Sequence, residues 1–221
     1  MSYVPLSYSR LCAVLMDDLE QNYDVVVALD STAQNRHGPV GVGKTNLGYI
    51  LAKTMNPHFD LKRDMVVKDD LNQAEHMMED RRPYKICWFD EAEWFFFLQW
   101  WQRSRVRAMT PEFMSNRKER RIWILNIPVI WGAVWFMVDY RIQWRLRMKD
   151  RYNVDVFMRS GIPSAKARKM DWWGSYRGTI SEIPKVPDRD WGRYEDLYLD
   201  HPKPCVRGRC VSAEPGGRLA S

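Results

Sequence analysis

Eight consecutive residues have the types and spacing of a phosphate-binding loop. The segment Gly38-Pro39-Val40-Gly41-Val42-Gly43-Lys44-Thr45 matches the pattern G-x-x-x-x-G-K-[ST] at every position. Such glycines let successive backbone N–H groups point at an anion, the lysine reaches the β- and γ-phosphates, and the threonine hydroxyl can bind Mg²⁺. The alternative is a glycine-rich turn that ends in Lys-Thr by chance, and the strand and helix patterns on either side disfavour it. We therefore predict a nucleotide-binding site at residues 38–45.

Two carboxylates follow a second apolar run. Ile86-Cys87-Trp88-Phe89 has the pattern of a buried strand and ends in Asp90-Glu91. Downstream of a phosphate-binding loop, such a pair has a use in nucleotide hydrolysis: Asp90 would hold Mg²⁺, directly or through water, and Glu91 would orient and deprotonate the attacking water. An acidic turn after a strand is the alternative. The preceding loop makes us favour the catalytic interpretation.

A polar residue also ends the third apolar run, Ile122 to Leu125. Asn126 stands at its end, where it would contact the γ-phosphate or the lytic water. The alternative is an asparagine that begins the turn before Pro128. We predict Asn126 as a further site residue.

Phosphoryl transfer also needs positive charge near the developing transition state. Arg141 is our first candidate for this role, with Arg117 and Arg121 behind it. In ring-forming ATPases such an arginine often comes from a neighbouring subunit, so its target can lie on another copy of the chain. A solvated surface arginine is the commoner alternative for each position.

Hydrophobic periodicity predicts the elements that must position these residues. Residues 140–148 alternate strictly between apolar and basic or polar side chains, so we predict a strand with Tyr140 and the other apolar residues inward and three arginines outward. The other predicted elements are helices over 11–19, from Thr45 to about Asn56, over 70–80 and over 94–101, and strands over 25–29, 65–67, 86–89 and 122–125.

Charge is divided unevenly along the chain of 221 residues, of which 45% are apolar. Residues 1–100 carry 10 Lys or Arg against 15 Asp or Glu, and residues 101–221 carry 24 against 13. A basic second half indicates an anionic partner, most simply DNA, although a basic surface that serves only solubility is the alternative. The residues that we expect to contact DNA lie in 103–121 and 141–151, and the first group comprises Arg103, Arg105, Arg107, Arg117, Lys118, Arg120 and Arg121.

The cysteine content and the hydropathy of the sequence indicate where in the cell the protein is located. Four cysteines, at 12, 87, 205 and 210, are too few and too scattered for a disulfide framework, and no secretory leader opens the chain, so we expect a cytoplasmic protein. His201, Cys205 and Cys210 are one ligand short of a typical zinc site. Residues 122–138 carry no charge, but Asn126, Pro128 and Gly132 divide them into a strand and a short helix rather than a membrane span.

Taken in order, these motifs resemble the P-loop NTPases that have an additional strand between the loop strand and the acidic strand, together with a catalytic glutamate. Within that division, three segments resemble the FtsK/HerA-like and zonula occludens toxin-like ATPases of phages and mobile elements: Asp90 to Glu93, Ile124 to Pro128 and Tyr140 to Trp144. The resemblance covers roughly residues 24–150. One departure is the insertion of residues 30–37 between the first strand and the loop.

The resemblance implies a three-layer α/β/α P-loop core with a mostly parallel sheet, which binds ATP and Mg²⁺, forms a homo-oligomeric ring and moves DNA during packaging or conjugation. Lys44, Glu91, Asn126 and Arg141 would be catalytic, and Thr45 and Asp90 would hold the metal. We divide the chain into an N-terminal helical segment (1–23), the ATPase core (24–150), a small C-terminal extension (151–203) and a tail (204–221).

Two other functions are compatible with the loop. A nucleotide-binding assembly factor, or one associated with membranes, could keep the same site without turnover. A small-molecule kinase of the nucleoside type also uses a glycine-rich loop, but it has no need for paired carboxylates at the strand end.

Overall fold

The computed structural model describes residues 6–22, 24–31, 43–97, 102–115, 119–159 and 174–200 of the chain. Most of the phosphate-binding loop, Gly38 to Val42, lies outside these residues, as do Arg117, Lys118 and the tail from His201 onward. The rest of the predicted site lies within them.

A seven-stranded, mostly parallel sheet organises the described residues, in the order β2-β3-β4-β1-β5-β6-β7. The first five strands in this order are parallel, whereas β6 is antiparallel to both β5 and β7. In chain order the strands are β1 (Asp24–Ser31), β2 (Met65–Val67), β3 (Ile86–Asp90), β4 (Arg121–Asn126), β5 (Trp144–Met148), β6 (Val154–Met158) and β7 (Ser175–Ile180). The fold is therefore α/β, and β4 lies between β1 and β3.

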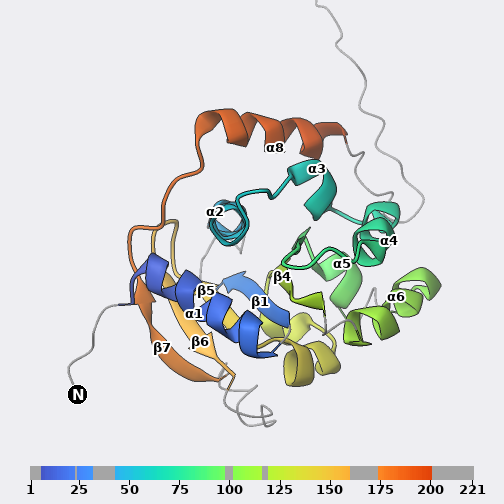
Figure 1. The fold of residues 1–221 in the computed structure, drawn as a ribbon, viewed down its shortest axis with the longest axis horizontal. Coiled ribbons are helices and arrows are strands. Elements are labelled where there is room, and N and C mark those ends of the chain that lie inside the picture. The colour runs from blue at the N-terminus through green and yellow to red at the C-terminus, as the bar shows by residue number, and fades with distance from the viewer. Residues whose placement is uncertain are drawn as a thin grey trace, which may run out of the picture.

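Helices pack on both faces of this sheet (Figure 1). Alternate residues of β1 belong to two separate apolar cores: Val25 and Val27 face α1 and α2, whereas Val26 and Ala28 face α4 and α6. The helices are α1 (Tyr8–Asn22), α2 (Lys44–Met55), α3 (Leu61–Asp64), α4 (Leu71–Glu79), α5 (Glu93–Phe96), α6 (Ser104–Ser115) and α8 (Asp188–Asp200), with a short 3-10 helix at Ile130–Gly132 and a π-helix at Met137–Arg141.

Helix α2 lies unusually close to the sheet at one point. A Cβ atom on Gly48 would come within 2.9 Å of the Trp88 ring on β3. A larger residue at this position would push α2 away from β3. Because α2 begins at Lys44 and β3 ends at Asp90, this close packing helps to fix the distance between the lysine and the carboxylate.

The strand pattern predicted for residues 140–148 is wrong in two respects. The strand begins only at Trp144, because residues 137–141 form the π-helix. Arg145 does not face solvent but is 1% exposed, whereas Tyr140 is 45% exposed. Both faces of this parallel sheet are covered, so the side that the alternation assigned to solvent is a second core.

The sheet also continues past residue 150, where we expected the core to end. Strands β6 and β7 pair with β5 and with each other, so they extend the same sheet. The predicted helix over 94–101 is represented by the four residues of α5, and residues 98–101 lie outside the described part. Among the described residues, no helix has the length and apolar character needed to cross a bilayer.

Candidate nucleotide-binding site

Five of the predicted site residues meet at the carboxyl edge of the parallel strands: Lys44, Thr45, Asp90, Glu91 and Asn126. The register pairs Phe89 with Leu125 and Leu29 with Asn126, so β3, β4 and β1 end side by side. Helix α2 begins at Lys44, directly above this edge, and its amino terminus carries the partial positive charge of the helix dipole. In open α/β sheets this edge is where ligands bind.

Gly43 makes the turn into α2 possible. Its φ angle is +92°, in the left-handed region that favours glycine, and a Cβ atom would lie 3.4 Å from the backbone of Arg151. Another residue there would strain the backbone at the point where the loop delivers Lys44. This is the part of the predicted loop that the structure describes.

Asp90 lies at the centre of the site and is 4% exposed. Its Oδ1 accepts hydrogen bonds from the Thr45 hydroxyl at 3.3 Å and from the Asn126 amide, and its Oδ2 accepts one from the Tyr194 hydroxyl at 2.5 Å. Burial raises the pKa of Asp90, and the three hydrogen bonds oppose this shift. All three donors are neutral, so no cation among these contacts balances the carboxylate charge.

Glu91 follows in a strained backbone conformation. Its φ angle is +69°, which is uncommon for a residue with a side chain and which points to a local constraint. One carboxylate oxygen accepts a hydrogen bond from the Tyr198 hydroxyl, and the other accepts one from Trp94 Nε1 at 3.3 Å. Both oxygens are therefore held by neutral donors.

Asn126 has an unsatisfied acceptor. Its Nδ2 donates to Asp90, and its buried Oδ1 has no hydrogen-bond partner among the described residues. A buried polar atom without a partner is costly and calls for an explanation. Since Asn126 also lines the cavity described below, its Oδ1 is available to accept a hydrogen bond from a water or ligand bound there.

A third carboxylate, on Glu93 at the start of α5, belongs to the same site. Burial raises the pKa of Glu93 to about 7, the negative charges of Glu91 and Asp90 add to the shift, and the Lys44 ammonium opposes it. Burial also lowers the pKa of Lys44, against the attraction of Glu93, Asp30 and Asp90. We did not single out Glu93 from the sequence as a site residue, although it lies two positions after Glu91.

These residues surround a cavity of about 820 Å³. Its volume lies in the range typical of small-molecule sites. Its walls come from the start of α2, the ends of β3 and β4, the turn after β5, and the segment that leads into α8. The lining residues are Gly43, Lys44, Thr45, Asn46, Asp90, Glu91, Glu93, Asn126, Ile127, Pro128, Arg151, Tyr152, Ile183, Lys185, Val186, Asp188, Trp191, Tyr194 and Tyr198.

We did not predict from the sequence that α8 contributes to this site. Tyr194 and Tyr198 come from more than 100 residues beyond the carboxylates that they contact, with separations of 104 and 107. The only local signal is the spacing of Trp191, Tyr194 and Tyr198, which puts three aromatic residues on one side of a helix. That pattern alone does not distinguish packing from a role in a site.

Arg141 lies away from the site, which corrects its assignment as a catalytic residue. Its guanidinium forms an ion pair with Asp24, at the opposite end of β1, and both side chains are 1% exposed. The arginine also lies over the Phe113 ring, 4.8 Å from its centroid. A side chain enclosed in this way reaches neither the cavity of its own chain nor that of another copy.

Several arginines predicted to contact DNA are engaged within the chain. Arg121 is fully buried and donates to the carbonyls of Met78 and Asp80, so it cannot contact a DNA backbone. Arg103 and Arg105 form ion pairs with Asp69 and Glu75. Arg107, by contrast, is exposed on α6.

The residues predicted to hold Mg²⁺ suit that ion in their chemistry. Thr45 and Asp90 offer a hydroxyl and a carboxylate oxygen 3.3 Å apart, and Mg²⁺ in nucleotide sites usually takes one or two protein oxygens besides phosphate oxygens and water. Within the described ranges, no group of three or more His, Cys, Asp or Glu is arranged to hold a metal by itself. A metal here would therefore depend on the nucleotide for most of its ligands.

No protein-family model matches the chain, and no curated protein matches it either.

Proposed function

We propose that the chain is a P-loop ATPase with a three-layer α/β/α core, which binds ATP with Mg²⁺ and hydrolyses it. The observation that carries the proposal is the meeting of Thr45, from the loop motif, with Asp90, from the acidic strand, beside a cavity. The strand order supports it, because β4 lies between the loop strand and the acidic strand, as in the division that the motifs resemble.

Each residue has a separable task in the proposed reaction. The backbone of the loop and Lys44 bind the phosphates, and Thr45 and Asp90 hold Mg²⁺, which when bound neutralises charge on the phosphates. Glu91 orients the attacking water and accepts its proton, and Asn126 Oδ1 accepts a second hydrogen bond from the same water. The lysine and the helix dipole of α2 supply the positive charge that Arg141 does not.

We further propose that hydrolysis drives DNA translocation or packaging for a phage or mobile element, in the cytoplasm and as a ring of several copies. The basic second half of the sequence supports a nucleic-acid partner. Fewer of the predicted arginines are available to contact nucleic acid, because contacts within the chain already engage Arg103, Arg105 and Arg121. The remaining candidates are exposed basic residues such as Arg107 on α6 and Lys149 after β5.

Phosphate release from ATP tests the proposal. We expect the wild type to release phosphate, faster with duplex or single-stranded DNA, and Lys44→Ala to lose both ATP binding and release. Glu91→Gln should keep ATP binding but lose release by at least about 100-fold, since general-base catalysis contributes about that factor or more. Lys62→Ala and Glu79→Gln, which remove the same charges from exposed positions, should leave release unchanged.

Two results would favour the alternatives. ATP binding that needs Lys44 but gives no release would favour a nucleotide-dependent assembly factor. Transfer of phosphate to a nucleoside rather than to water would establish a kinase. Equal ATP binding by the wild type and Lys44→Ala would remove the site altogether.

A further inference from the structure

Helix α8 lies across the candidate site and packs against the outside of one apolar core through side chains that are only partly buried: Trp191, Tyr194, Leu197 and Tyr198. In Figure 1 it lies above α2 and α3, on the side of the sheet where α2 packs. None of its residues from Asp188 to Tyr198 is buried. Just before it, Ile183 and Val186 are buried, at 4% and 8% exposure. The chain is thus anchored ahead of α8, whereas the helix itself rests on the surface.

The anchor is tied directly to the start of α2. The Asn46 side chain donates to the Pro184 carbonyl and accepts from the Val186 amide, both at 2.9 Å. Asn46 follows Thr45, so the segment that leads into α8 is fixed next to the predicted phosphate-binding residues. This arrangement provides a fixed point about which α8 can move.

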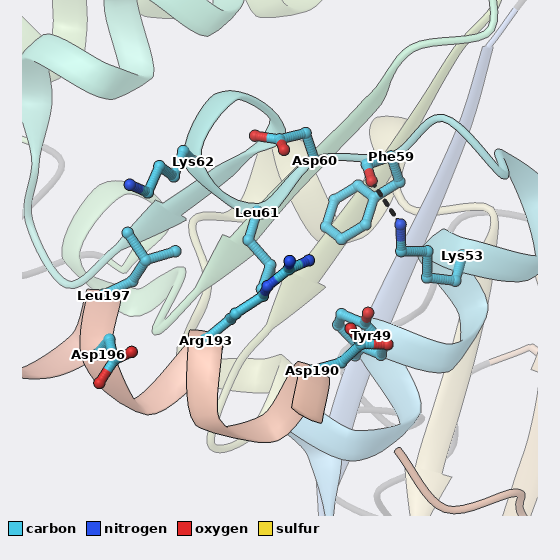
Figure 2. A pocket seen from close by; sticks show the side chains of 10 residues that line it. All are labelled: Tyr49, Lys53, Phe59, Asp60, Leu61, Lys62, Asp190, Arg193, Asp196 and Leu197. Carbon is cyan, nitrogen blue, oxygen red and sulfur yellow. Dashed lines mark hydrogen bonds between the residues drawn. The ribbon is translucent and has the colours of Figure 1, made fainter. Parts of the chain in front are cut away.

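Beneath α8 lies a second cavity, of about 410 Å³, and six of its ten lining residues are charged. Figure 2 shows its two walls: Tyr49 and Lys53 of α2 with Phe59 to Lys62 on one side, and residues of α8 on the other. The α8 side carries Asp190, Arg193 and Asp196. Segments with few buried apolar contacts are those that open at the lowest free-energy cost.

Trp191 and Leu197 contribute apolar packing, but most of the polar contacts of α8 with the rest of the molecule are on its tyrosines. The Tyr194 and Tyr198 hydroxyls donate to Asp90 and Glu91, the two carboxylates of the proposed reaction. The Tyr194 ring stacks on Trp88, with 6.4 Å between centroids, and Lys68 donates to the Tyr198 carbonyl at 3.0 Å. The contacts of α8 therefore depend on groups that a nucleotide and its metal would also use.

We infer that α8 is a strap that holds Asp90 and Glu91 through Tyr194 and Tyr198, and that binding of a metal–nucleotide complex displaces it. The inference rests on the proposed function. The Tyr194 hydroxyl occupies Asp90 Oδ2, and the Tyr198 hydroxyl occupies the carboxylate that would accept the proton of the lytic water. A ligand that needs these oxygens must compete with the tyrosines, so its apparent affinity is its intrinsic affinity multiplied by the fraction of molecules in which α8 is open.

The test compares Tyr194→Phe/Tyr198→Phe with the wild type. Phenylalanine keeps the rings that stack on Trp88 and lie beside Lys68 but removes both hydroxyls. Calorimetry with Mg²⁺ and the non-hydrolysable analogue adenylyl imidodiphosphate should show about 10-fold tighter binding in the double variant, equivalent to about 1.4 kcal/mol. Tyr176→Phe, on β7, is the matched control and should bind as the wild type does.

Amide hydrogen exchange provides a second readout that does not depend on turnover. In the wild type, the metal–nucleotide complex should accelerate exchange at residues 188–198 while it slows exchange at the start of α2. Equal or weaker binding by the double variant, or unchanged exchange in α8 with ligand bound, would overturn the strap. Binding by neither protein, or binding that Lys44→Ala leaves intact, would instead overturn the proposed nucleotide site.

Discussion

Two sets of carboxylates in this molecule, buried or partly buried, differ in what holds them. Asp24 and Asp30 form ion pairs with Arg141 and Arg145, and all four side chains are at most 1% exposed. The second set, Asp90 and Glu91, is held by hydroxyl, amide and indole donors, all of them neutral. The two sets occupy the same sheet, so their surroundings rather than their place in the fold distinguish them.

The difference indicates which carboxylates can recruit a ligand. A buried carboxylate next to an arginine has its charge balanced permanently, and removal of either partner leaves an uncompensated charge. A carboxylate held by neutral donors retains a negative charge that a cation can still stabilise. On this basis we assign a structural role to the arginine pairs, and Asp90 and Glu91 are the set that we propose to be functional.

The largest expected effect is on the arginine pairs. Arg141→Met should lower the free energy of unfolding by about 3–5 kcal/mol, because it leaves Asp24 buried and unpaired. Urea unfolding measures this change. Asp24→Leu in the same chain should recover much of the loss, since the pair is then replaced by apolar groups. An Arg141→Met protein of wild-type stability that had lost ATP hydrolysis would reverse the assignment of this arginine.

A smaller effect is expected from a substitution of Asp90, and it concerns ligand affinity rather than the free energy of unfolding. Asp90→Asn should leave the free energy of unfolding near or above that of the wild type, because burial already raises the pKa of this carboxyl and penalises its charged form. The affinity for Mg²⁺ with adenylyl imidodiphosphate should fall by at least about 10-fold, about 1.4 kcal/mol. Stability lost together with affinity would mean that Asp90 belongs with the structural set.

The raised pKa of Glu93 should make the free energy of unfolding depend on pH. In the folded chain the pKa of Glu93 is about 7, so its proton is kept up to about that pH, whereas the unfolded chain loses it near the ordinary glutamate pKa of 4.5. Between these values the unfolded state binds fewer protons, so the free energy of unfolding falls as the pH rises, and the loss is complete above pH 7. Burial is the largest cause of the raised pKa of Glu93, the charges of Glu91 and Asp90 add to it, and Lys44 opposes it.

Glu93→Gln should therefore be as stable as the wild type at pH 4 and more stable at pH 8, by roughly 1 kcal/mol after allowance for partial solvent screening. Thermal unfolding across this pH range measures the difference. Parallel stability curves for the two proteins would show that Glu93 ionises as an ordinary surface carboxylate.

Local patterns were sufficient to predict much of the fold and part of the site. Apolar runs that end in polar residues indicated where β3 and β4 end, and parallel pairing then brings Asp90 and Asn126 to one edge. The loop motif placed Lys44 and Thr45 at the start of a helix. These features depend on neighbours in the sequence, which is why they could be predicted.

The remaining features depend on pairs that are distant in the chain. Arg141 and Arg145 are separated from their aspartates by 117 and 115 residues, so alternation within the segment gave no sign of burial. Tyr194 and Tyr198 likewise contact carboxylates that are distant in the sequence, by 104 and 107 residues. An exposed and a buried arginine look alike in sequence until the partner strand is known.

The smallest expected effect concerns DNA and the arginines that face solvent. Arg105 and Arg107 are both exposed on α6, but Arg105 is engaged with Glu75 and Asn72. If α6 contacts a phosphate backbone, Arg107→Ala should weaken binding several-fold and reduce the slope of log affinity against log salt by about 1. Arg105→Ala should change both quantities less, because a phosphate must first displace Glu75. Equal slopes for both variants and the wild type would mean that DNA, where it binds, uses another surface. The distinction between charged side chains paired within the chain and those open to a ligand would then hold for the carboxylates but not for these arginines.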